Sequence, residues 1–299
     1  MWLSAVLAGV FFWSWVNVLD SATVKRYPVT PVALMWVQSC FSTLFLALFY
    51  FVIRVPAPDI VWILLFSGSI AYAADLVFLT AIRHIDISVT NIAWSILAVF
   101  ETIAGFWIFG ERWGLGETLA AIFILASVTV LSLWHRQVGS TGKELLFLPL
   151  LASLYLPFYI IQKWALVRGV SFVEIFFWQM VGRELLSFVL GMGVPPFRRQ
   201  VFASFPYWKS KYLILNALII GCFLIGTGFG QLGYLLGPIS LSGILTNLQP
   251  FVVLLLAGLL AYFVPTLAPR ELLTLQSLRV KIVCFGLVFL GLALLAFHQ

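Results

Sequence analysis

Residues 239–263 read ISLSGILTNLQPFVVLLLAGLLAYF, without a single Asp, Glu, Lys or Arg. About 20 mostly apolar residues are enough to cross the hydrocarbon core of a bilayer as a helix. The run Leu254-Leu255-Leu256 lacks the alternation of a transmembrane strand, so the stretch predicts a membrane helix. Pro250 carries no backbone N–H, which predicts an unbonded carbonyl about one turn earlier, near Thr246.

The same pattern recurs along the chain. The other apolar windows, bounded by charges, Pro or Gly, are residues 2–22, 31–53, 60–82, 87–109, 115–134, 145–167, 171–194, 212–236 and 280–297. Ten windows of this length use roughly 200 residues and leave short loops. The sequence therefore predicts an all-α integral membrane protein with ten transmembrane helices, located in the cell membrane.

Composition supports this class. The chain is 63% hydrophobic and only 9% charged, whereas a soluble domain has roughly 25% charged residues. The net charge of +6 comes from basic residues scattered at window ends, which does not favour nucleic acid as a partner. Cys40, Cys222 and Cys284 each lie inside an apolar run, so we interpret them as packing residues; no metal or cofactor is expected.

The polar residues near the centre of the chain predict two halves. We place a linker at 137–144, a first five-helix repeat at 1–136 and a second at 145–299. Ile87-Ser88 matches Ile239-Ser240 at a constant offset, although such identities are sparse. An odd number of helices per repeat inverts the second copy relative to the first.

Glycine spacing and one aromatic loop add two expectations. Gly226, Gly230, Gly233 and Gly237 give Gly-xxx-Gly spacings that favour close packing or flexing of the eighth helix. The loop 196–211 is basic and aromatic, which predicts an interfacial segment on the membrane surface.

Several motifs carry a resemblance to a known family. They are Trp13-Ser-Trp-Val-Asn17, Ala81-Ile-Arg83 with Ile87-Ser88, Phe109-Gly-Glu-Arg112 and Asn247-Leu-Gln-Pro250. On these motifs both halves resemble the EamA-like branch of the drug/metabolite transporter superfamily. The resemblance implies a secondary transporter that exports a small solute. Two departures are Gln38, where a basic residue is frequent, and residues 264–270, where the second half lacks the Gly-Glu-Arg turn.

Four ionisable residues lie deep inside their windows: Asp75, Glu101, Arg183 and Glu184. Each costs at least about 2.5 kcal/mol to insert, so each requires a partner or a role. Glu101 is predicted as a proton or cation site and Arg183 as an anchor for an anionic group; alternatively, the two pair structurally across the bundle. Arg183 and Glu184 point about 100 degrees apart, so they are not assumed to pair.

Other candidates are less charged. Asp75 follows small residues and is predicted to meet a substrate amine or a helix hydroxyl. Neutral polar side chains that either line the site or bond helices together are Asn17, Asn91, Asn247 and Gln249. Aromatic residues that either line a cavity or contact lipid are Trp13, Tyr72, Trp94, Tyr155, Tyr159, Trp178 and Tyr234. Asp20 and Lys163 lie at window ends and are expected to snorkel.

The sequence predicts a secondary transporter that works by alternating access around a midplane cavity containing Glu101, Asn247 and Gln249. Acidic and basic candidates together suit a zwitterion such as an amino acid, with proton exchange at Glu101. The alternative is a non-transport membrane protein, either a lipid-modifying enzyme or a helical interaction subunit; no hydrolase, protease or ATPase motif is present, so an enzyme is not expected. The other expected partners are membrane lipids, and a homodimer is left open.

Overall fold

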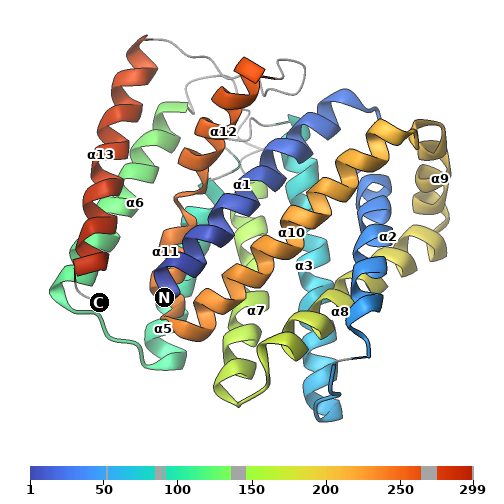
Figure 1. Ribbon diagram of the computed structural model, residues 1–299, viewed down its shortest axis with the longest axis horizontal. Helices are drawn as coiled ribbons and strands as arrows, with labels where there is room; N and C mark the ends of the chain where they lie inside the picture. The colour runs from blue at the N-terminus through green and yellow to red at the C-terminus, as the bar shows by residue number, and fades with distance from the viewer. Residues whose placement is uncertain (52, 85–89, 91, 136–145, 264–274, 298–299) are drawn as a thin grey trace.

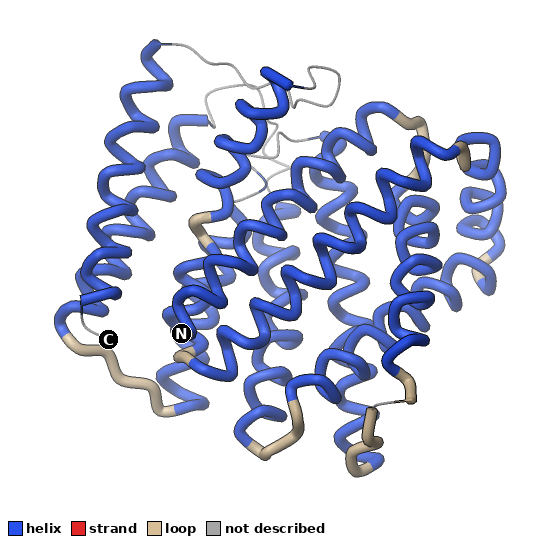
Figure 2. The backbone as a smooth tube through the Cα atoms, in the orientation of Figure 1, coloured by secondary structure: helices blue, strands red, loops and turns tan. Residues whose placement is uncertain are grey.

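The computed structural model describes residues 1–51, 53–84, 90, 92–135, 146–263 and 275–297. Its helices are α1 (Trp2–Arg26), α2 (Pro31–Phe49), α3 (Pro58–His84), α5 (Ile92–Phe109), α6 (Leu115–His135), α7 (Phe147–Val167), α8 (Phe172–Gly193), α9 (Pro195–Ser204), η2 (Phe205–Tyr207), α10 (Ser210–Leu236), α11 (Ile239–Thr246), α12 (Gln249–Phe263) and α13 (Leu275–Phe297). No strand occurs in the described ranges (Figure 2). The predicted all-α class is confirmed.

Seven stretches are long and apolar enough to cross a membrane. They are Trp2–Arg26, Pro31–Phe49, Pro58–Arg83, Phe147–Val167, Phe172–Gly193, Ser210–Leu236 and Ile239–Leu260. Shorter apolar helices, Ala93–Phe109, Leu115–Ser127 and Ile282–Leu295, coincide with the fourth, fifth and tenth predicted windows. Ten spans and the inverted repeat stay predictions. Several sequence features lie outside the described residues: Ile87-Ser88, Asn91, the linker 137–144 and residues 264–270.

The outer surface of the bundle is apolar. Trp62, Trp107 and Phe289 are 72%, 87% and 77% exposed. Exposure of such large apolar side chains is unfavourable in water but not in lipid. The burial pattern therefore fits an integral membrane protein whose polar residues face inward.

Local sequence signals explain how two helices begin. The Thr30 hydroxyl accepts a hydrogen bond from the Ala33 backbone nitrogen at 3.4 Å, and Pro31 opens α2. Ser171 and Glu174 form a reciprocal capping box at the start of α8.

The loop predicted at 196–211 contains a helix. Residues Pro195–Ser204 form α9, which packs against α2 and α8 at one side of the bundle (Figure 1). Trp208 stacks on Trp36 with ring centroids 5.8 Å apart, while Phe202 is half exposed. Trp208 of this segment thus packs against the helical bundle. Contact of the exposed aromatic side chains, such as Phe202, with a membrane surface stays a prediction.

The ninth window is broken into α11 and α12 close to Pro250. Backbone nitrogens of Asn247 and Leu248 donate to the carbonyls of Ile244 and Leu245, at 3.1 and 3.0 Å, in tightened i to i−3 bonds. The carbonyl of Thr246 has no N–H four residues ahead, because that position is Pro250. The sequence predicted a missing backbone bond here within one helix, whereas the structure divides the window into two helices.

Glycines bring two helix pairs into backbone contact. α1 and α10 lie side by side and antiparallel (Figure 1), and a Cβ added to Gly9 would lie 3.0 Å from the Gly230 nitrogen. In the pair α3 and α8, a Cβ on Gly68 would overlap the Gln179 carbonyl, and one on Gly182 would overlap the Leu65 carbonyl. The predicted close packing of the glycine-rich eighth window is confirmed.

Candidate functional site

A cavity of about 80 Å³ lies between helices drawn from both predicted halves. Among its lining residues are sequence-predicted candidates from α1, α3, α5, α8 and α12, namely Asn17, Asp75, Trp94, Arg183 and Gln249. The predicted aromatic residues that line it are Trp13, Trp94, Tyr155 and Tyr159. We call this space the central cavity.

A buried ionic cluster borders the central cavity. Arg183 Nε donates to Asp75 Oδ2 at 2.7 Å, and Arg183 Nη1 donates to Glu184 Oε1 at 2.8 Å. The Tyr155 hydroxyl donates to the other Asp75 oxygen, and the guanidinium lies 4.7 Å from the Phe223 ring centroid. The sequence left open whether Arg183 and Glu184 pair; the structure pairs them, because the long, flexible arginine side chain can reach the neighbouring carboxylate.

Glu101 lies apart from this cluster. Its side chain is 1% exposed and packs against Gly243 of α11, where an added Cβ would overlap the carboxyl group. Tyr234 donates to Glu101 Oε1 at 3.0 Å, whereas Oε2 has no hydrogen-bond partner among the described residues. The alternative in which Glu101 pairs with Arg183 is therefore wrong: Arg183 has two carboxylate partners of its own.

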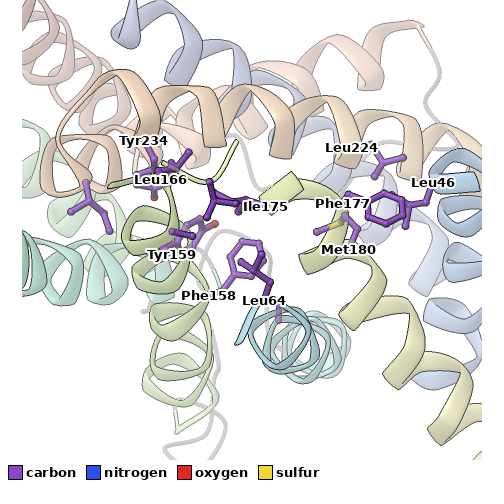
Figure 3. Close-up of a cluster of buried hydrophobic side chains, with 14 of the residues drawn as sticks. Leu46, Leu64, Phe158, Tyr159, Leu166, Ile175, Phe177, Met180, Leu224 and Tyr234 are labelled. Atoms are coloured by element: carbon purple, nitrogen blue, oxygen red, sulfur yellow. The ribbon is translucent and has the colours of Figure 1, made fainter. Parts of the chain in front are cut away.

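Two aromatic rings connect Glu101 to the central cavity. Tyr159 lines the cavity, and its ring centroid lies 5.2 Å from that of Tyr234, which bonds Glu101 (Figure 3). Asn247 also lies behind the lining, where its Nδ2 donates to the Gly243 carbonyl at 3.1 Å. Glu101 and Asn247 thus both contact Gly243, and neither lines the central cavity.

Two residues expected to snorkel form hydrogen bonds inside the protein. Asp20 is 5% exposed, lines the central cavity and accepts a hydrogen bond at 2.9 Å from Nε2 of Gln38. Lys163 donates to the carbonyls of Tyr234 and Gly237 at 2.7 and 2.8 Å, at the end of α10. Position within a hydropathy window gives depth but not direction, so sequence reasoning missed Asp20.

Sequence reasoning also missed two glutamines. Gln162 and Gln231 are buried and line the central cavity. Gln162 follows Tyr155 and Tyr159 on α7 by seven and three residues, which places all three on one helix face. That spacing is a signal by which Gln162 is recognisable in the sequence.

The Gly-Glu-Arg turn joins the two predicted halves. Gly110 adopts a φ of 66°, which favours glycine, and the chain turns so that Glu111 reaches the start of α11. Glu111 Oε1 accepts from the Ile239 nitrogen at 2.7 Å; Oε2 accepts from the Ser240 nitrogen at 3.1 Å and from the Ser240 hydroxyl. Trp113 Nε1 donates to the same hydroxyl at 2.9 Å. A first-half carboxylate thus caps a second-half helix.

Possible metal-ligating side chains do not gather in the part of the chain that the structure describes. It contains no group of three or more His, Cys, Asp or Glu side chains able to hold an ion. The site is therefore characterised by ion pairs, amides and aromatic rings.

Comparisons with known proteins agree with this architecture. A solved structure described as "Crystal structure of protein" aligns with a TM-score of 0.67 at 19% identity, covering 98% of this chain and 96% of that chain. At this identity the likeness shows a shared fold. A comparison with curated proteins finds no match. Residues 1–133 match the model of the EamA-like transporter family. The resemblance of the chain to EamA-like transporters, first drawn from its motifs, is therefore confirmed over residues 1–133.

Proposed function

We propose that the protein is a secondary transporter that moves a small metabolite or drug-like solute across the cell membrane. The observation that carries this proposal is the central cavity, in which the ion pair of buried Arg183 with partly buried Asp75 faces aromatic walls. Buried charges in a membrane protein are costly and are typical of substrate or ion pathways. The match to a transporter family over residues 1–133 supports the same function.

The charges of the cavity favour a zwitterionic solute. Arg183 already contacts Asp75 and Glu184, so a solute carboxylate binds by replacing one of these partners. The released Asp75, together with Asp20, then accepts a solute ammonium group. Such an exchange of partners leaves few buried charges unpaired, which limits its cost.

Coupling to protons is proposed at Glu101. Its buried carboxyl has the neutral Tyr234 as a hydrogen-bond donor and no cation within salt-bridge distance in the described ranges. A carboxyl in such a place is stable when it carries a proton, and it requires a cation or water when it does not. Alternating access that exposes Glu101 to each side in turn couples proton movement to solute export.

Counterflow in vesicles tests the transport function. Purified protein is reconstituted into liposomes loaded with an unlabelled amino acid, and entry of the same labelled amino acid is measured across a panel of amino acids. We expect at least one to accumulate transiently, and Asp75→Asn to abolish this accumulation. Asp59→Asn is the matched control, since Asp59 is exposed on the same helix. Absence of counterflow for every compound in correctly folded protein would refute the solute class.

A pH gradient tests the coupling separately. We expect an imposed gradient to drive solute accumulation in the wild type and Glu101→Gln to retain counterflow while losing this response. A response that is unchanged in Glu101→Gln contradicts proton exchange at this residue and leaves transport itself intact.

A further inference from the structure

The orientation of one buried amide is fixed by a hydrogen-bond chain. Gln179 Nε2 donates to the Ser67 hydroxyl at 2.8 Å and to the Phe158 carbonyl at 3.3 Å. A carbonyl can only accept, so the amide nitrogen of Gln179 faces it. The Gln179 oxygen then accepts from Gln231 Nε2 at 3.0 Å. Gln231 is left with its oxygen, an acceptor that is buried and has no partner in the described part of the chain.

A second amide on the cavity wall has both of its polar groups unused. Gln162 is 0% exposed, and neither its nitrogen nor its oxygen bonds any residue that the structure describes. Buried polar groups in folded proteins are nearly always hydrogen-bonded. Gln162 and Gln231 both line the central cavity, so a bound molecule is able to supply the missing partners.

An aromatic wall continues from these amides. Tyr155 and Tyr159 precede Gln162 on the same face of α7, with ring centroids 6.2 Å apart. Trp94 of α5 packs against Tyr155 at 5.2 Å, and all three rings line the cavity. Flat π faces of this kind favour a planar group.

We infer that Gln162 and Gln231 form a subsite for an uncharged planar group that carries an N–H donor beside a carbonyl acceptor. A carboxamide, a lactam or a pyrimidine-type ring has this edge. The solute N–H donates to an amide oxygen, the Gln162 nitrogen donates to the solute carbonyl, and the ring or amide plane lies against the aromatic wall. This inference rests on the proposed transport function, because it assigns the neutral end of the same solute.

Stability of the empty protein tests the unused amide without any ligand. We expect Gln162→Leu to raise the melting temperature of ligand-free protein by roughly 2 to 4 °C, because an unsatisfied buried amide is replaced by an apolar side chain of similar size. Gln179→Leu is the matched control: this amide is fully bonded, so its loss lowers the melting temperature. An unchanged or lowered value for Gln162→Leu would overturn the inference, since the amide is then satisfied by protein or water.

A pair of probes tests the recognised edge. Binding of uracil and of 1,3-dimethyluracil, in which both N–H donors are blocked, is measured by thermal shift. Uracil is expected to bind the wild type roughly tenfold or more tightly than its dimethyl form, and Gln162→Leu to remove the difference. Equal binding of the two probes, or absence of binding by both, overturns the subsite even where amino acid counterflow stands. Failure of all amino acid counterflow refutes the proposed solute class, whereas the stability and probe measurements still report on the amides.

Discussion

Glu111 offers a quantitative test of how the two predicted halves are joined. Its carboxylate accepts two backbone N–H bonds, from Ile239 and Ser240, and one hydroxyl bond from Ser240, at the first turn of α11. A neutral N-cap contributes about 1 kcal/mol to stability. Charge-assisted bonds are roughly twice as strong as neutral ones, and the helix dipole adds about 0.3–1 kcal/mol. We therefore expect Glu111→Ala to lower the free energy of unfolding by about 2–4 kcal/mol.

The conservative variant has a smaller effect. Glu111→Gln keeps one acceptor oxygen but points an NH2 group at backbone N–H donors, so we expect a loss of about 1–2 kcal/mol. The assay is unfolding of purified protein in mixed detergent micelles, with melting temperature as a second readout.

Two comparisons isolate the contact between halves. Glu117→Ala is the control, because Glu117, in the first turn of α6, accepts a hydrogen bond from the nearby Gly114 nitrogen at 2.7 Å within its own half. A double-mutant cycle with Ser240→Ala should give a coupling of at least about 0.5 kcal/mol. The reasoning is refuted if Glu111→Ala costs no more than Glu117→Ala, or if the effects of Glu111→Ala and Ser240→Ala simply add.

The other predictions concern charge and packing. Arg183→Gln leaves the buried Glu184 and the partly buried Asp75 without their cation and should cost about 3–5 kcal/mol. Asp75→Asn preserves the pair of Arg183 with Glu184 and should cost about 1–2 kcal/mol. Equal losses of stability for the two variants in melting experiments contradict the cluster. Gly68→Ala places a methyl group on the Gln179 carbonyl and should lower the melting temperature sharply. Gly221→Ala, at a helical position with open space, should leave it unchanged or raise it slightly; the reverse order contradicts the helix contact.

Hydropathy predicted the helices because lipid leaves the backbone no other way to satisfy its polar groups. The missing backbone bond near Pro250 was predictable from the local sequence, because proline has no N–H, but the division into two helices was not predicted. Partners were not predictable: Arg183 and Asp75 lie far apart in sequence, and no local rule selects Asp75 over Glu101 as the carboxylate that meets the guanidinium. Asp20 shows the same limit, because whether it faces lipid, water or a cavity depends on the packing of α1 against other helices.

The glycine contacts determine which parts of this protein can move as rigid bodies. Each joins one helix from either predicted half, α1 with α10 and α3 with α8, and backbone lies against backbone at Gly9 in the first pair and at Gly68 and Gly182 in the second. Such interfaces resist sliding, because even a small shift drives backbone atoms into one another. If the first predicted half moved as one rigid body relative to the second, both glycine contacts, α1 with α10 and α3 with α8, would have to break together. In the proposed transport cycle we therefore expect these cross-half helix pairs to move as units, with the change between states occurring where the pairs meet, around Arg183 and the break between α11 and α12.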